Sequence, residues 1–550
     1  MLIIAKTFQG LEEVLAKEII ELGANDVEIG NRMVSFTGDK EMLYRANFCL
    51  RTAVRVLMPI KTFKSSDADD VYEVVKKMPW SDYMDVNQTF LIDAVVFSNT
   101  FRHSKFVAYR VKDAIADYFR ETTGERPNVS ISNPDIRINV HIAEEKVTIS
   151  LDSSGESLHK RGYRTGSVAA PINEVLAAGM LRLAGWEGQC DLIDPFCGSG
   201  TILIEAALMA MNIYPGVFRD EFGFERWKDF DEDLLDRIYN DDSDEREFDH
   251  KIYGYDINRQ AVAVALDNVR SAGVSKVVEV SQQDFYDFDW NGSEAMMMTN
   301  PPYGERITTD DILDLYDTIG NRLKRAFAGN EAWILSSHEE CFDKIRLRPS
   351  TKFALYNGSL PCELRKYQVF SGKLSDLKGE GEDIKTDEER QRNAKYKPLR
   401  RRDDDSTFDG KSWRDAGGSR DDEHYFRSRP NRKDYRDDKK PFERKNPKDR
   451  TPLFEGDDEP RLNRHNFKWG DRGSDYEPED GDRRPFGKDR KSSHHRDEKK
   501  FRRDDKGFRR DDKKSFEQKF SKTKNHKASK GGKPRFGFDE EGRPFRLDED

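Results

Sequence analysis

Two short motifs, separated by about one hundred positions, carry the residues best suited to chemistry. They are Asp194-Pro195-Phe196-Cys197-Gly198-Ser199-Gly200 and Asn300-Pro301-Pro302-Tyr303. In the first, the glycines let the backbone turn tightly and approach a ligand with no Cβ in the way. In the second, the asparagine offers a side-chain oxygen that can accept hydrogen bonds from a planar amine. The pair predicts a nucleotide-like cofactor held beside an amino group on a base.

The first motif follows a predicted strand and opens a predicted helix, which is the setting that a glycine-rich cofactor loop requires. It lacks the third glycine of dinucleotide-binding loops and the Lys-Ser/Thr pair of phosphate loops, so pyrophosphate binding is disfavoured. Asp194, at the start of the loop, suits a cationic amino-acid moiety. We expect Asp194, Phe196, Gly198 and Gly200 to contact the cofactor.

Two further acidic residues follow the next predicted strands. Asp256 ends one strand, where a carboxylate can accept both hydroxyls of a ribose. Asp284 follows the next strand and can accept from an adenine amino group, with Phe285 packed nearby. Taken singly, each acidic residue is explained as well or better as a helix cap. Three of them at successive strand ends, beside the glycines, predict S-adenosylmethionine as the cofactor.

The second motif fits the acceptor amine. The lone pair of an amino group on a base is delocalised, so catalysis needs acceptors that hold its hydrogens while the nitrogen pyramidalises. The Asn300 side chain and the Pro301 carbonyl can be those acceptors, while Pro302 fixes the turn and Tyr303 stacks on the base. A double proline can also simply end a strand. A sulfonium donor makes a strong base unnecessary, so positioning and electrostatics suffice, and an unpaired base is the cheapest target.

The elements that position both motifs alternate between strand and helix after Cys190, which predicts a parallel sheet with sites at the carboxyl ends of its strands. The expected strands are 191–193, 252–255, 277–280, 295–298 and 332–335, with helices at 201–211, 259–272 and 311–327 and a hairpin at 353–356 and 365–370. We expect this α/β, Rossmann-like domain to span residues 190–372. Residues 153–189 form a connector with a helix.

Residues 1–64 and 65–152 predict two smaller α+β units. Two basic clusters are candidates for RNA contact: one lies before a predicted helix in the second unit, and the other lies in the connector. Each is equally well explained as a solvated segment. The candidate residues are Arg102, His103, Lys105, Lys160, Arg161 and Arg164.

Charge is unevenly distributed along the 550 residues. The whole chain has a net charge of -10, but residues 391–550 carry +11, and much of the acidity lies between Asp220 and Asp249. Residues 380–550 have few apolar side chains to bury, so we expect a disordered tail. Its arginines, lysines and phenylalanines either add RNA affinity or keep the chain soluble.

The five cysteines are widely spaced, which predicts neither disulfides nor a metal site and fits a reducing cytoplasm. No signal peptide or membrane span is expected.

The chain resembles the THUMP-domain class I methyltransferases, and most closely the large-subunit ribosomal RNA guanine-N2 methyltransferases of the RlmL type. The similarity covers roughly residues 1–372 and rests on specific stretches: His103-Ser104, Lys112–Ile115, His159–Arg164, Asp194–Ala207, Asn300–Arg306, Leu355–Leu360 and Cys362–Arg365. It implies a ferredoxin-like domain at 1–64, a THUMP RNA-binding domain at 65–152, an S-adenosylmethionine pocket at the residues named above, and 23S ribosomal RNA, free or in a precursor particle, as partner. Some members fuse a second methyltransferase where this chain has its tail.

Three alternatives remain open at this stage. The amine-binding motif also fits adenine-N6 methylation, and THUMP domains also occur in enzymes that methylate guanine N2 in tRNA. A different class is an RNA-binding ribosome-assembly factor in which methylation is secondary. The loss or retention of cellular effect in Asn300→Ala distinguishes the enzyme from the assembly factor.

Overall fold

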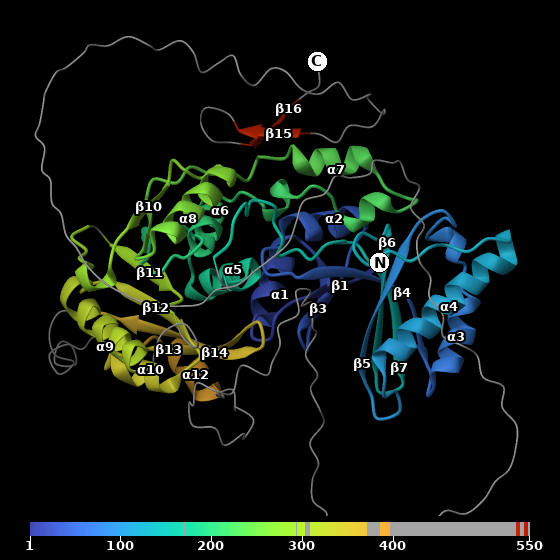
Figure 1. Ribbon diagram of the computed structural model, residues 1–550, viewed down its shortest axis with the longest axis horizontal. Coiled ribbons are helices and arrows are strands. Elements are labelled where there is room, and N and C mark those ends of the chain that lie inside the picture. Colours follow the sequence, from blue (N-terminus) through green and yellow to red (C-terminus); the bar gives the residue numbers. More distant parts are fainter. Residues whose placement is uncertain are drawn as a thin grey trace, which may run out of the picture. The chain divides into compact units, whose positions relative to one another are not determined.

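The computed structural model describes residues 1–168, 171–292, 294–302, 309–370, 385–396, 535–538 and 544–547. These residues form two seven-stranded sheets and one short two-stranded sheet (Figure 1). None of the helices within these ranges is long and apolar enough to cross a membrane.

The first sheet contains both of the predicted α+β units. Its strands, in spatial order, are β2 (Asn25–Gly30), β3 (Met33–Thr37), β1 (Leu2–Lys6), β4 (Arg55–Lys64), β7 (Lys146–Asp152), β6 (Ile136–Ala143) and β5 (Phe90–Phe97). All pairs are antiparallel except β5 with β6. The first half of β4 pairs with β1 and the rest pairs with β7. The two units therefore share one continuous sheet, joined at β4.

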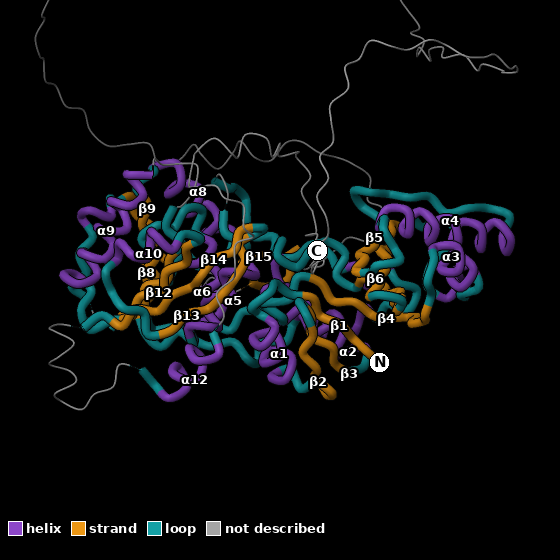
Figure 2. The backbone as a smooth tube through the Cα atoms, turned by 90° about the horizontal axis from the view of Figure 1, so that it is seen from below, coloured by secondary structure: helices purple, strands orange, loops and turns teal. Residues whose placement is uncertain are grey.

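Four helices accompany this sheet: α1 (Glu12–Glu21), α2 (Lys40–Cys49), α3 (Ala68–Lys76) and α4 (Ser104–Thr123). The Asp39 side chain caps α2 by accepting from the Met42 amide, and Asp67 caps α3 in the same way. The helix α4 ends at Gly124, whose φ of +81° is left-handed and favours glycine. Buried side chains of α4, including Val107, Val111 and Ile115, face the core, and α3 lies beside α4 in both views (Figure 2).

The second sheet is the predicted Rossmann-like sheet. Its order is β10 (Val278–Gln282), β9 (Ile252–Asp256), β8 (Asp191–Asp194), β11 (Ala295–Thr299), β12 (Glu331–Ser336), β14 (Leu360–Gln368) and β13 (Thr351–Asn357). The first five strands are parallel, and the hairpin β13–β14 adds antiparallel strands at one edge. The accompanying helices are α5 (Glu174–Ala184), α6 (Thr201–Ala210), α8 (Arg259–Ser271), α9 (Thr309–Ala326) and α10 (Glu339–Ile345). The chain runs outward from β8 to β10 and then returns to β11, so the strand order reverses between β8 and β11.

The acidic segment between Asp220 and Asp249 packs against the N-terminal half of the chain. It contains a short 3-10 turn, η3 (Gly223–Arg226), and the helix α7 (Glu232–Tyr239). Phe222 and Phe224 are fully buried in the same hydrophobic core as the first sheet, and the Phe224 ring stacks on Tyr44 with centroids 3.9 Å apart. Arg226 pairs with Asp135 at 2.8 Å. The acidic segment thus joins the half of the chain that contains the Rossmann-like sheet to both N-terminal units.

Two short parts of the predicted disordered tail have regular structure. The helix α12 (Asp387–Lys395) packs on β13, where the Arg392 guanidinium lies 4.8 Å from the centre of the Phe353 ring. Asn393 Nδ2 donates to the Ser350 carbonyl at 2.6 Å. The strands β15 (Arg535–Phe538) and β16 (Pro544–Leu547) pair with each other. The remainder of the predicted tail lies outside the described residues, so its disorder stays a prediction.

Candidate functional site

The candidate cofactor and amine-binding residues meet at the carboxyl edge of the second sheet. Asp194 ends β8, Asp256 ends β9, Asp284 follows β10 and Asn300 follows β11. In open α/β sheets, ligands bind at the edge where the strand order reverses. Here the reversal lies between β8 and β11, directly between the glycine loop and the asparagine. The topology therefore brings together the two motifs that the sequence separates by about one hundred positions.

The glycine loop is held open by its backbone conformation and by bonds to β9. Gly198 and Gly200 have φ angles of +54° and +81°, which are left-handed and favour glycine. The Cys197 amide donates to the Tyr255 carbonyl at 2.9 Å, and the Gly198 amide donates to Asp256 Oδ2 at 3.0 Å. The loop is thus fixed to the neighbouring strand before any ligand binds.

Asp194 is the most buried of the three candidate acidic residues, with 1% of its surface exposed. Its Oδ1 accepts from the Thr299 hydroxyl at 2.7 Å and from the Phe196 amide at 3.1 Å. Burial raises the pKa of Asp194 to about 7, although both hydrogen bonds act in the opposite direction. This carboxyl group therefore changes its protonation state near neutral pH.

Asp256 and Asp284 are less enclosed. Asp256 accepts one amide on each oxygen, from Gly198 and from Asn258, which leaves lone pairs for ligand hydroxyls. Asp284 caps the short 3-10 helix η4 (Phe285–Asp287) by accepting from the Tyr286 amide at 3.0 Å. The cap that we considered as the simpler explanation is therefore present, and its second carboxylate oxygen can still serve a ligand.

The two predicted aromatic contacts differ in their surroundings. Phe285 is 4% exposed and stacks on Phe288 at 5.3 Å, so it belongs to the core. Phe196 is half-buried and lies 5.0 Å from Phe285, ring centre to ring centre. Phe285 therefore packs against Phe196, and of the two rings only that of Phe196 is partly exposed.

The amine-binding motif begins with an unsatisfied acceptor. Asn300 Oδ1 is buried and has no hydrogen-bond partner within the described residues. A buried polar atom without a partner costs about 1–3 kcal/mol, so its retention calls for an explanation such as a bound ligand. Pro301 is buried and Pro302 half-buried, whereas Tyr303 lies outside the described residues and its stacking role stays a prediction.

The predicted RNA contacts at the start of α4 are exposed. Arg102, His103 and Lys105 all face solvent. Beside them, Phe106 is 53% exposed and Tyr109 is 60% exposed, with the Lys112 ammonium 5.8 Å from the centre of the Tyr109 ring. We did not predict these two aromatics from the sequence. Helical periodicity was the available signal, because it places them opposite the buried Val107 and Val111.

The second predicted RNA cluster needs a correction. Lys160 is exposed and pairs with Glu156, so it remains available at the surface. Arg161 is only 2% exposed, lies beside the fully buried Glu205 and donates to the Arg51 and Leu158 carbonyls. Arg164 bonds to Glu174 and to the hydroxyls beside Gly200. Both arginines are therefore used inside the protein, and we no longer assign RNA contact to them.

The fold and the site together define a class. Three features are typical of the class I methyltransferases when they occur together. They are a parallel sheet with this reversal, a loop of left-handed glycines, and acidic acceptors at three successive strand ends. The acceptors fit S-adenosylmethionine, whose ribose hydroxyls and amino groups are donors. Within the described residues, no cluster of side chains is arranged to hold a metal ion.

Comparisons with known proteins agree along the chain. Residues 2–57 match the RlmL ferredoxin-like domain, residues 65–152 the THUMP domain and residues 161–366 the RMKL-like methyltransferase domain. A putative RNA methyltransferase of Synechocystis sp. is 39% identical over 369 residues, which are 66% of this chain and 96% of that protein.

The ribosomal RNA large subunit methyltransferase K/L of Marinomonas sp. is 38% identical over 378 residues, 67% of this chain and 52% of that protein. The chain thus spans about half the length of this K/L relative. The crystal structure of SMU.472, a putative methyltransferase complexed with SAH, is 29% identical with a TM-score of 0.61, over 68% of this chain and 99% of that one. The chain belongs to the THUMP-domain RNA methyltransferases that use S-adenosylmethionine.

Proposed function

We propose that the protein methylates the exocyclic N2 amino group of a guanine in 23S ribosomal RNA, either free or in an assembling large subunit in the cytoplasm. The similarity to the K/L enzymes supports the choice of RNA. The observation that supports an amino group as the methyl acceptor is Asn300 Oδ1, which has no hydrogen-bond partner among the residues that the structure describes and lies where the strand order reverses.

The chemistry follows from the acceptors at the end of β11. Asn300 Oδ1 and the Pro301 carbonyl each accept a hydrogen bond from one N–H of the amino group. These bonds direct the nitrogen lone pair to the side away from the two acceptors. When bound, S-adenosylmethionine supplies a methyl group on a sulfonium, whose departure leaves a neutral thioether. The protein then has to orient the amine. The nitrogen becomes cationic and therefore acidic as it gains the methyl group, so it releases a proton to water and no strong base is required.

Asp194 contributes to the placement of the amine. Its hydrogen bond to Thr299 fixes the residue that precedes Asn300. The position of the amine-binding asparagine is therefore tied to the start of the glycine loop. We propose that this contact keeps the amine in line with the methyl donor.

RNA binding would involve the exposed surface of α4. Phe106 and Tyr109 offer flat faces for unpaired bases, and Arg102, His103 and Lys105 offer charge or hydrogen bonds for phosphates. A base in a loop or single strand can reach an enclosed site without the cost of unpairing.

Nucleoside mass spectrometry of ribosomal and transfer RNA, from cells with and without the gene, tests the proposal. We expect N2-methylguanosine to fall in large-subunit RNA and to return when the gene is restored, but not when Asn300→Ala is restored. A fall in N6-methyladenosine would show that the substrate is an adenine, and a fall in N2-methylguanosine of tRNA alone would show that the substrate is tRNA. Unchanged nucleosides, with a growth defect that Asn300→Ala rescues, would favour the assembly factor.

A further inference from the structure

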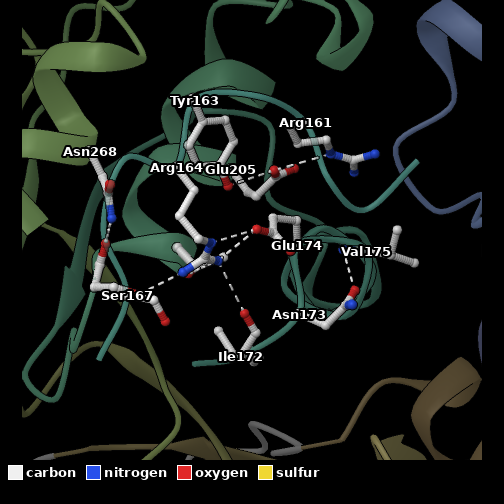
Figure 3. Close-up of polar contacts among 12 residues, drawn as sticks. Arg161, Tyr163, Arg164, Ser167, Ile172, Asn173, Glu174, Val175, Glu205 and Asn268 are labelled. Carbon is white, nitrogen blue, oxygen red and sulfur yellow. Dashed lines mark hydrogen bonds and ion pairs between the residues drawn. The ribbon is translucent and has the colours of Figure 1, made fainter. Parts of the chain in front are cut away.

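The connector between the THUMP domain and the second sheet contacts the cofactor loop directly. Arg164 donates to the two hydroxyls of the turn formed by Ser199, Gly200 and Thr201, and Thr165 and Gly166 bond to Asn268, which also binds this turn. Figure 3 shows Arg164, Glu174 and Asn268 in this region. None of the motifs that suggested a cofactor site lies in this connector.

Arg164 spans the turn with a single guanidinium group. Its Nη1 donates to Ser199 Oγ at 2.8 Å, and its Nη2 donates to Thr201 Oγ1 at 2.8 Å. The two hydroxyls lie on either side of Gly200, which has a left-handed φ. A glycine has no Cβ, so its backbone rotates more freely than that of other residues. The planar guanidinium presents its donors in a fixed geometry, so it sets the distance between the two hydroxyls.

Glu174, in the first turn of α5, holds the arginine in place. Its Oε1 accepts from Arg164 Nε at 2.8 Å and lies 2.7 Å from Arg164 Nη2. The Glu174 side chain is 7% exposed and that of Arg164 is 20% exposed. A charged pair that is this enclosed and also hydrogen-bonded to two hydroxyls has little rotational freedom.

Asn268, on α8, binds the same turn from the opposite side. It is fully buried, and its Nδ2 donates to the carbonyls of Ser199 at 2.9 Å and Gly166 at 3.1 Å. Its Oδ1 accepts from the Thr165 and Gly166 amides. The side chain of Asn268 therefore forms hydrogen bonds with both the cofactor loop and the connector.

We propose that Arg164 and Asn268 are positioning residues for the S-adenosylmethionine-binding loop, and that Arg164 acts through Ser199 and Thr201. Without them, the part of the loop from Ser199 to Thr201, which the bonds to β9 do not reach, would have to be ordered when the cofactor binds, and the entropy of ordering would be subtracted from the affinity. This inference concerns cofactor affinity alone and does not depend on which RNA is methylated.

Isothermal titration of the full-length protein with S-adenosylmethionine, and separately with S-adenosylhomocysteine, tests the inference. Arg164→Lys keeps the charge but loses the fixed fork, and Thr201→Val loses one hydroxyl while keeping its volume. We expect the dissociation constant of each variant to rise at least about tenfold. The KM for the cofactor should rise with it, while RNA affinity stays unchanged.

Hydrogen exchange gives a second measurement in the absence of cofactor. The amides of residues 198–201 should exchange faster in Arg164→Lys and in Asn268→Ala than in the wild type. Arg45→Lys is the matched control, because Arg45 pairs with Glu41 on α2, outside the site. It should change neither cofactor affinity nor exchange in this loop.

The outcomes separate positioning from a purely structural role. A structural role would lower the melting temperature and leave the folded fraction with wild-type cofactor affinity, and this result would overturn the inference. Should Arg164→Lys fail to fold, Thr201→Val alone decides: wild-type affinity in that variant overturns the inference, and weakened affinity with a wild-type melting temperature supports it.

Discussion

The Thr299 hydroxyl donates a hydrogen bond of 2.7 Å to Asp194 Oδ1, and this contact joins the ends of β8 and β11. Asp194 begins the cofactor loop, and Thr299 immediately precedes Asn300. Because both residues are buried, the bond is protected from competing water. The glycine loop and the proposed amine-binding asparagine are therefore linked by this pair of side chains as well as by the pairing of β8 with β11.

Asp194 should make stability depend on pH. Its pKa of about 7 exceeds the ordinary value of about 3.9, so the stability it contributes is present below about pH 4 and is lost as the pH rises through 7. Asp194→Asn removes this titration. We expect the unfolding free energy of the wild type, minus that of the variant, to fall by about 2–4 kcal/mol between pH 4 and pH 8. Urea denaturation across this range measures it, and a constant difference would refute the assignment.

Asn300→Ala should abolish most of the activity without removing the cofactor. It deletes the unpaired buried acceptor, and loss of a comparable preorganised hydrogen-bonding group costs about 10²–10³ in kcat. Single-turnover methylation measures the rate, and titration with S-adenosylhomocysteine should give a nearly wild-type dissociation constant. Asn321→Ala, on α9, is the control. If kcat is unchanged, another group holds the amine.

Phe106→Ala and Tyr109→Ala should each weaken RNA binding. Base stacking on an exposed aromatic contributes about 1–3 kcal/mol per base, which is roughly 5-fold to 150-fold in affinity. Fluorescence anisotropy with single-stranded RNA at fixed salt measures the effect. Ile131→Ala is the control, because Ile131 is 81% exposed but has no ring. Equal affinity of all three variants and the wild type would exclude α4 as a stacking surface.

Lys105→Ala should act differently from the aromatic substitutions. Loss of a phosphate contact lowers affinity for all sequences alike and reduces the salt dependence of binding by about one unit of slope. The measurement is a series of binding curves between low and physiological salt. A slope equal to that of the wild type would mean that Lys105 does not contact a phosphate.

Phe224→Ala should destabilise the N-terminal half of the chain. Phe224 is fully buried and stacks on Tyr44, so its removal leaves a cavity that costs about 3–5 kcal/mol. Chemical denaturation measures the loss. Phe106→Ala removes an equal side chain from an exposed position and should leave stability nearly unchanged. A small effect of Phe224→Ala would mean that the acidic segment does not anchor the two N-terminal units.

Arg161 and Lys160 are neighbours in the sequence, but their substitution should affect stability to very different extents. Arg161→Ala leaves the buried Glu205 without its cation and should cost about 3–5 kcal/mol of stability. Lys160→Ala should change stability by less than about 0.5 kcal/mol, because its side chain is exposed. Denaturation and RNA-binding curves on both variants test the pair. A stable Arg161→Ala with weakened RNA binding would restore the original prediction.

The sequence by itself determined the class of the fold and predicted the chemistry of its main site. Alternating strand and helix patterns predicted the strands from β8 to β12 and the helices α6, α8 and α9 to within two residues at every boundary, because amphipathic periodicity is local information, whereas α7 was not predicted. The glycines and the Asn-Pro-Pro-Tyr motif predicted the cofactor loop and the amine-binding residues for the same reason. Each is defined by neighbours along the chain.

Only the tertiary structure decided where the charged residues act. Arg161 and Arg164 lie in a basic run whose sequence is equally typical of an exposed linker, and their burial depends on Glu205 and Glu174 from other elements. The shared strand β4 and the burial of Phe224 against Tyr44 likewise join positions distant along the chain. Burial and long-range pairing arise from packing between elements, and local patterns of one sequence do not contain that information.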